Sequence, residues 1–113
     1  MKQYTTPEQT AKLIELGLPK PKNRIVKQRF DRSTSSWIVV GEEGAYSIGE
    51  LIEMLPKKIE MSDDETGELE VSFGNLCMVY YTSFGVIYYD TEATELIDAL
   101  YDMIIKIKEE GVI

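Results

Sequence analysis

The side chains with which this sequence could do chemistry are carboxylates, tyrosines and one cysteine. The 113 residues include no histidine, which excludes a histidine general base, a Ser-His-Asp triad and an imidazole metal ligand. The single cysteine, Cys77, has no histidine to activate it and cannot alone make a cysteine-rich zinc site. An enzyme made from this sequence would therefore have to work with Asp, Glu and Tyr side chains in a cleft.

An acidic segment at residues 63–68 is the part of the sequence most similar to a metal-binding loop. With Gly67 at the sixth position of a calcium loop, Ser62 would be first and Phe73 twelfth, where such a loop needs a bidentate Glu. The pattern fails there. Residues 41–44 likewise lack the Lys and the Ser or Thr of a phosphate-binding loop. The sequence thus predicts no catalytic residue, no cofactor-binding residue, no metal ligand and no cofactor.

Most of the tyrosines and Cys77 lie in a run of strand patterns between residues 57 and 90. Apolar and polar residues alternate there with period two, which predicts an antiparallel meander. Four strands are expected, at residues 57–62, 68–73, 76–82 and 86–90.

Turn chemistry suggests how these strands pair. Gly74 followed by Asn suits a two-residue type II′ turn, which would pair Phe73 with Leu76 and Val71 with Met78. All four apolar residues would then share one face of the sheet.

Two other turns extend that face. A five-residue loop would pair Met61 with Leu69, and a three-residue loop ending at Gly85 would pair Thr82 with Val86. A two- or four-residue loop would change this last pairing, so both alternatives stay open.

The opposite face of the predicted sheet is polar on its first two strands and apolar on its last two. Tyrosine is enriched at interfaces, although aromatic residues in strands usually pack within the fold. A contiguous apolar patch is unusual on a monomer, so we expect residues 25–40, a second copy of the chain or another protein to cover it. The residues of this possible interface are Cys77, Val79, Tyr81, Ile87 and Tyr89.

Helices are predicted on both sides of the meander in the sequence. Residues 47–55 begin with a capping box at Ser47 and Glu50 and stop at Pro56. Residues 91–110 carry a broad apolar stripe at helical spacing.

The first third of the chain is predicted to hold a helix and strands. Thr6 and Gln9 form a second capping box, and Gly17 suits the end of that helix. Residues 25–30 and 37–40 are candidate strands on either side of a polar loop.

Taken together, these patterns predict a single α+β domain over residues 1–113. An antiparallel β-meander at about 57–90 would carry helices 47–55 and 91–110 on one face, with an N-terminal helix beside them. No apolar run approaches the roughly 20 residues that a membrane helix needs. The single cysteine and the absence of a signal-peptide pattern point to the cytoplasm.

Charge is distributed unevenly along the chain, whose net charge is −8. Residues 1–36 carry eight Lys or Arg and three acids, a net of +5, and residues 37–113 carry four and seventeen, a net of −13. An acidic protein binds nucleic acid poorly without sequence specificity. We interpret the basic stretch from Lys20 to Arg32 as a solvated surface.

Three segments resemble parts of a known group of proteins. Residues 6–17, 46–56 and 95–111 are similar to segments of short uncharacterised proteins of gut Bacteroides-type bacteria and their phages or mobile elements. The resemblance implies a cytoplasmic protein of a bacterium or phage. It assigns no activity, and no functional residue can be transferred from it.

The sequence favours a non-enzymatic small binding or accessory protein of a bacterium or its mobile elements. A carboxylate- and tyrosine-based enzyme and an acidic nucleic-acid mimic are the alternatives. The expected partner is a second copy in a homodimer or another protein, while a membrane and nucleic acid are disfavoured.

Overall fold

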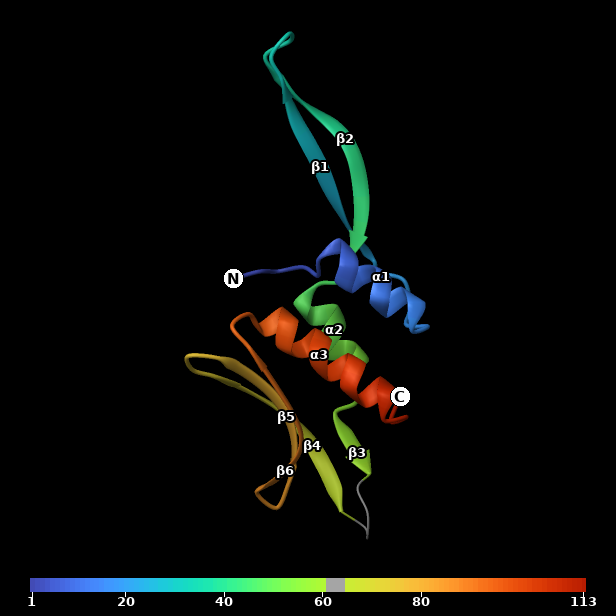
Figure 1. Ribbon diagram of the computed structural model, residues 1–113, viewed down its shortest axis with the longest axis vertical. Coiled ribbons are helices and arrows are strands. Elements are labelled where there is room, and N and C mark those ends of the chain that lie inside the picture. Colours follow the sequence, from blue (N-terminus) through green and yellow to red (C-terminus); the bar gives the residue numbers. More distant parts are fainter. Residues whose placement is uncertain (61–64) are drawn as a thin grey trace. The chain divides into compact units, whose positions relative to one another are not determined.

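A computed structural model describes residues 1–60 and 65–113 of the chain (Figure 1). It has the α+β architecture expected from the sequence, with two antiparallel sheets. The elements in order are α1 (Pro7–Glu15), β1 (Asn23–Asp31), β2 (Ser36–Ala45), α2 (Ile48–Met54), β3 (Lys58–Glu60), β4 (Thr66–Phe73), β5 (Cys77–Ser83), β6 (Val86–Ala93) and α3 (Leu96–Glu109). They form two compact units, one made of Met1–Tyr4 with Ser47–Ile113 and one made of Thr5–Tyr46.

The larger unit is the predicted meander with its helices. Its strands lie in the order β3-β4-β5-β6, α3 packs on β5 and β6, and α2 packs against α3. The apolar stripe of α3 is buried, as the helical spacing predicts. Its buried residues are Leu96, Ile97, Ala99, Leu100, Met103, Ile104 and Ile107.

The pairing of β4 with β5 differs by one residue from the predicted register. Phe73 lies opposite Cys77, and Val71 lies opposite Val79. The prediction of a type II′ turn was wrong, because Gly74 lacks the positive φ that this turn requires at its first central residue. A one-residue shift moves every side chain of β5 to the other face of the sheet.

The turn between β5 and β6 is shorter than predicted. Ser83 pairs with Val86 across a two-residue turn in which Phe84 and Gly85 have φ values of 50° and 78°. Positive φ at both central residues is typical of a type I′ hairpin turn. A bulge follows, so that Tyr81 lies opposite Tyr89 and the predicted pairing of Thr82 with Val86 is wrong.

The first strand of the meander, described over Lys58–Glu60, pairs with β4 in a different register from the predicted one. Ile59 lies opposite Gly67, and the Leu69 N–H donates to the Lys57 carbonyl at 2.9 Å. The predicted partner of Leu69, Met61, lies outside the residues that the structure describes, as do Ser62 and the two aspartates of the acidic segment. Leu69 therefore takes a position that the five-residue loop did not predict.

The last helix begins later than predicted. Residues 91–93 continue β6, with Ala93 opposite Cys77, and α3 starts at Leu96. The Thr91 hydroxyl donates to the Ala99 carbonyl at 2.7 Å, which fixes the end of the strand against the helix. The N-cap of α3, Glu95, makes no side-chain capping hydrogen bond, so the sequence carries no cap signal there.

Both predicted capping boxes are confirmed. Thr6 and Gln9 exchange hydrogen bonds at the start of α1, and Ser47 and Glu50 do the same at the start of α2. Gly17 ends the α1 segment with a φ of 88°.

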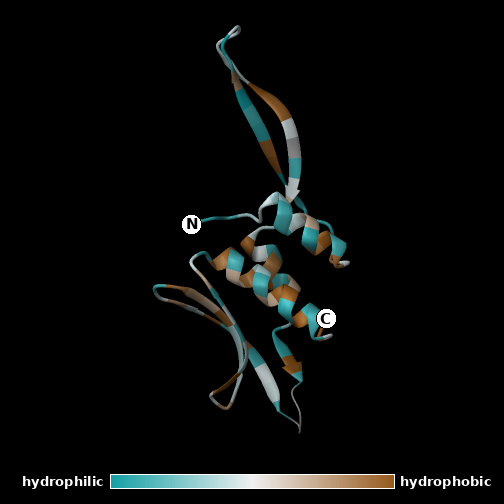
Figure 2. Cartoon of the chain, viewed as in Figure 1, coloured by the Kyte–Doolittle hydropathy of each residue, from teal (hydrophilic) through white to brown (hydrophobic). Residues whose placement is uncertain are grey.

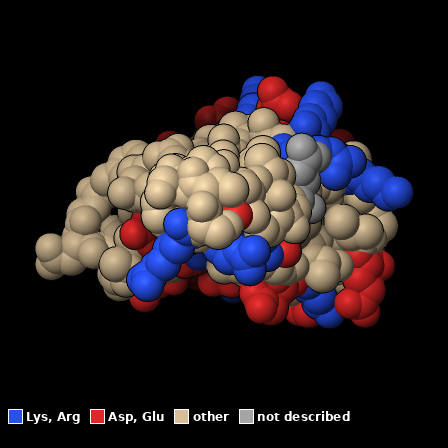
Figure 3. Space-filling model, turned by 90° about the horizontal axis from the view of Figure 1, so that it is seen from above, with Lys and Arg blue, Asp and Glu red and all other residues tan. Residues whose placement is uncertain are grey.

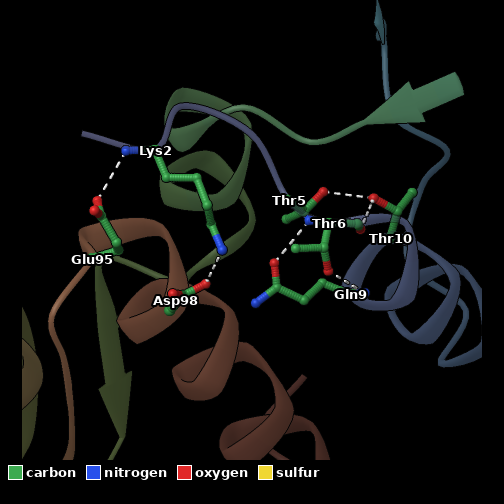
Figure 4. A network of polar contacts seen from close by, with 7 residues as sticks. All are labelled: Lys2, Thr5, Thr6, Gln9, Thr10, Glu95 and Asp98. Atoms are coloured by element: carbon green, nitrogen blue, oxygen red, sulfur yellow. Dashed lines mark hydrogen bonds and ion pairs between the residues drawn. The ribbon is translucent and has the colours of Figure 1, made fainter. Parts of the chain in front are cut away.

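Polar contacts also tie each unit together. In the smaller unit, the Thr5 N–H donates to the Tyr46 carbonyl and the Tyr46 N–H donates to Thr5 Oγ1, both at 3.0 Å. In the larger unit, Lys2 donates from its N–H to Glu95 and from Nζ to Asp98, at 2.9 and 2.6 Å (Figure 4). Within each unit these hydrogen bonds join residues that are far apart in the sequence.

In the smaller unit, β1 and β2 form a two-stranded antiparallel sheet that extends away from α1 (Figure 1). We call this sheet the ribbon. Its strands are longer than predicted, because β2 continues through residues 41–44, where the sequence suggested an end. None of the helices in the described part of the chain is long and apolar enough to cross a membrane.

Candidate interaction surface

The side chains predicted to form an interface lie mostly inside the larger unit. Val79 and Tyr81 are fully buried and Cys77 is 9% exposed. They alternate along β5 on the side of the sheet that packs on α3, so their placement on an open face was wrong. The one-residue error in the register explains this, because it exchanges the two faces of the strand.

The other two predicted interface residues do not share one face. Tyr89 lies opposite Tyr81 on the α3 side and is half-buried, while Ile87 lies opposite Thr82 and is 49% exposed. The bulge in β6 between these pairs separates them. The sequence does not show this bulge, so it could not have been included in the prediction.

The polar atoms of these buried residues are occupied within the fold. The Tyr81 hydroxyl donates to the Pro56 carbonyl at 2.7 Å, and burial raises the pKa of Tyr81 to about 12. The Cys77 thiol donates to the Thr94 carbonyl at 3.8 Å. Tyr81 and Cys77 therefore act as core residues here.

The outer face of the meander holds a shallow groove that bears on the enzyme hypothesis. It is lined by Glu70, Ser72, Met78, Tyr80, Thr82, Gly85 and Ile87. Acid–base catalysis by carboxylates normally uses two of them, and of the residues that line this groove Glu70 alone is a carboxylate. Tyr88 donates its hydroxyl to Glu65, and that hydrogen bond raises the pKa of Tyr88, but neither residue lines the groove. Within residues 1–60 and 65–113, no three metal-ligating side chains come together.

The ribbon, by contrast, carries hydrophobic residues on both of its strands (Figure 2), and several of their large side chains are exposed. These residues are 45–66% exposed: Val26 45%, Phe30 46%, Val40 55%, Val39 62% and Trp37 66%. Apolar residues on a strand are usually covered by a second layer. In the described part of the chain, no such layer buries these five.

The register of the ribbon places most of these side chains on one face. Phe30 lies opposite Trp37 and Gln28 lies opposite Val39, and opposite residues share a face of the sheet. Val26 lies two residues before Gln28 in β1, so it is on the same face. The rings of Phe30 and Trp37 meet edge to face, with centroids 5.5 Å apart. Val40 is the extra residue at a bulge, between the pairs Lys27–Gly41 and Gln28–Val39.

Charge differs between the two strands of the ribbon. β1 carries Arg24, Lys27 and Arg29, whereas residues 36–40 of β2 carry no charge. Lys27 Nζ lies 2.5 Å from a carboxylate oxygen of Glu43 at the base of β2. Seen from above, Lys and Arg side chains form separate groups with uncharged and acidic side chains between them (Figure 3).

A tight loop closes the far end of the ribbon. Asp31 Oδ1 accepts hydrogen bonds from the Ser33 hydroxyl at 2.7 Å and the Ser33 N–H at 2.9 Å. The hydroxyl, followed by the backbone N–H, lowers the pKa of Asp31. Ser35 has a φ of 53°, which completes the reversal of the chain. The loop is thus ordered by its own side chains.

Sequence reasoning noticed these residues without assigning them to a hairpin. Two β-branched and aromatic runs on either side of a short polar loop are a hairpin signal. The loop holds no Gly or Pro, and the two glycines that follow suggested that the strand had ended. The exposure of both runs had no signal in the sequence at all, since β-branched residues are equally common in buried strands.

Comparison of the chain with protein-family models found no match, and neither did comparisons with curated proteins and with solved structures.

Proposed function

We propose that the chain is a small non-enzymatic binding or accessory protein and that it binds a protein partner through the ribbon. The observation that carries this proposal is the exposure of Trp37, Val39 and Val40, at 55–66%, on a sheet of only two strands. An isolated two-stranded hairpin is marginally stable in water. A partner that covers the ribbon would therefore supply the missing layer or strand.

The mode of binding that fits the ribbon is the addition of a strand. A strand at the edge of a sheet presents unpaired N–H and C=O groups, and a partner strand can pair with them. Main-chain hydrogen bonds then give affinity, and alternate side chains such as Trp37 and Val39 give specificity.

The alternative functions have less support. The groove on the meander has a single carboxylate, Glu70, which does not favour a carboxylate-based enzyme. We also place the protein in the cytoplasm of a bacterium that carries it or its mobile element, on the basis of the resemblance and the single cysteine.

A photo-crosslinking experiment tests the proposal. A photoreactive amino acid is incorporated at position 39, on the ribbon, or at position 53, an exposed position on α2, in cells of a Bacteroides-type bacterium. We expect protein adducts from position 39 that are absent from position 53. If position 39 gave no adduct, or if both positions gave the same adducts, the ribbon would not be the binding element.

A further inference from the structure

Two adjoining hollows lie in the smaller unit, between α1 and the base of the ribbon. The first, of about 280 Å³, is lined by Pro7, Thr10, Ala11, Ile14, Glu43 and Gly44. The second, of about 260 Å³, is lined by Ile14, Lys20, Pro21, Arg24 and Gly44. Because both are lined by Ile14 and Gly44, they form one continuous groove, which we call the α1 groove.

The wall that α1 contributes to this groove is apolar. Pro7, Ala11 and Ile14 are spaced at i, i+4 and i+7, so they lie along one side of the helix. All three are exposed, and Ile14 is 40% exposed. Leu13 lies off this stripe and is fully buried. The helix therefore places apolar residues along the groove in addition to those that it places in the core.

Gly44 keeps the second hollow open. It lies opposite Arg24 in the ribbon, and a Cβ built on it would come within 3.0 Å of Pro21 Cγ. A side chain at position 44 would therefore press against Pro21, in space that now belongs to the groove.

Two cations lie at the end of the groove that Pro21 lines. Lys20 and Arg24 are both exposed, and none of the residues that line the second hollow is an acid. Among the side chains that the structure describes, neither cation forms an ion pair, whereas Lys27 pairs with Glu43 at the other end of the groove. The groove is thus apolar along α1 and positively charged beside Pro21.

We propose that the α1 groove binds an acidic segment of the protein partner, with an apolar side chain against Ile14 and a carboxylate beside Lys20 and Arg24. This inference rests on the proposed function and names the chemistry of the partner. A carboxylate accepts two parallel hydrogen bonds from an arginine, which makes it a better complement to Arg24 than an uncharged amide. The apolar side chain would remove the exposed surface of Ile14 from water.

The position of the groove favours a polypeptide over a small free carboxylate. Arg24 and Gly44 share a face of the ribbon with Val26, Phe30 and Trp37, because residues two apart on β1 and residues opposite each other point the same way. This face extends about 20 Å from Arg24 to Phe30, at about 3.4 Å per residue. A small carboxylate would fill the groove and leave the face uncovered, whereas a polypeptide can cover both.

NMR titration of the full chain with short capped peptides tests the inference. The probe is acetyl-Leu-Asp-Leu-Asp-amide. One matched peptide has Asn in place of Asp, which removes the carboxylates, and another has Ala in place of Leu, which removes the large apolar side chains. We expect the probe to shift the backbone amides of Ile14, Arg24 and Gly44, more weakly as salt is added. Each matched peptide should bind at least about threefold more weakly.

Two matched variants separate the groove from the general charge of the ribbon. Arg24→Gln and Arg29→Gln remove the same charge from the same strand, but position 29 lies on the opposite face. Both side chains are exposed, and circular dichroism checks that both variants remain folded. We expect Arg24→Gln to weaken binding of the probe about threefold or more and Arg29→Gln to weaken it by less than about 1.5-fold.

Several results would overturn the inference. These are no shift of the groove amides by the probe, equal binding of the Asp and Asn peptides, or equal weakening by the two arginine variants. Inorganic phosphate that shifts the same amides as strongly as the probe would show a general anion site instead. A DNA duplex whose binding falls equally in both arginine variants, and which displaces the probe, would make nucleic acid the ligand of this surface.

The photo-crosslinking experiment distinguishes failure of this inference from failure of the proposed function. Adducts from position 39, without binding of the probe at the α1 groove, would refute the groove and leave the ribbon as the binding element. Binding of the probe at the groove, without adducts from position 39, would refute the ribbon and support the groove.

Discussion

Strands β5 and β2 are both rich in apolar and β-branched residues, yet one is core and the other is surface. Val79 in β5 is fully buried, and Val39 in β2 is 62% exposed. β5 lies inside a four-stranded sheet and beneath α3, while β2 has one neighbouring strand. The difference teaches that the neighbours of a strand, and not its own residues, decide whether its apolar side chains form a core or an interaction surface.

The largest expected effect compares these two valines directly. Val79→Asp puts a carboxylate into the packed side of the meander, which should lower the free energy of unfolding by at least about 4 kcal/mol. Val39→Asp places the same group in solvent and should change it by about 0.5 kcal/mol or less. Chemical denaturation of the dilute chain, where self-association does not contribute, measures both.

Equal losses from the two valine variants would contradict the comparison. The side chains of the ribbon would then be buried in solution, and they would not be available to bind a partner.

The tyrosines of β5 sharpen the comparison within one strand. Tyr81→Phe removes the hydrogen bond to the Pro56 carbonyl and should cost about 1–2 kcal/mol, whereas Tyr80→Phe on the outer face should cost almost nothing. Burial raises the pKa of Tyr81 to about 12 from the ordinary tyrosine value of 10.0. Its contribution to stability is therefore complete below pH 10 and is lost as the pH rises toward 12.

Denaturation at several alkaline pH values checks this second prediction. The wild type should lose stability between pH 10 and 12 more steeply than Tyr81→Phe does. Identical slopes in the two proteins would mean that Tyr81 is not buried in the folded chain.

The helix caps give a smaller effect that distinguishes the two units. Thr6→Ala and Ser47→Ala each remove a capping box and should each cost about 1 kcal/mol. If the units open separately, Thr6→Ala should speed amide hydrogen exchange in α1 and leave α3 unchanged, and Ser47→Ala should do the opposite. Faster exchange in both units from either variant would show that they unfold together.

Much of the fold was predictable because its signals are local. The two capping boxes and the alternation of Leu69, Glu70 and Val71 in β4 depend on residues close together in the sequence, and the structure confirms them. Phe73, predicted on the same apolar face, is 67% exposed. The start of α3 was missed because residues 91–93 pair with β5, and Glu95 provides no side-chain cap. The pairing of residues 91–93 with β5 thus overrode a local sequence pattern that, considered alone, predicts a helix.

The candidate site was less predictable than the fold. A turn of different length between β4 and β5 moved Cys77, Val79 and Tyr81 from the expected surface to the core, and a bulge in β6 separated Tyr89 from Ile87. Neither feature has a signature in the residues themselves. The ribbon was missed for a different reason. The exposure of Trp37 depends on whether another element packs over it, and the residues of the strand do not determine this.

Hydrogen exchange at single backbone amides tests the central claim, that the ribbon presents an open strand edge for binding. Amides of β5 at residues 78–81 should exchange slowly at every concentration, because the strand is paired on both sides. In residues 36–40, the amides that point away from β1 should exchange fast in the purified chain and become protected when the partner crosslinked at position 39 is added. Protection of these amides in the purified chain alone, or rapid exchange in the complex, would contradict the account.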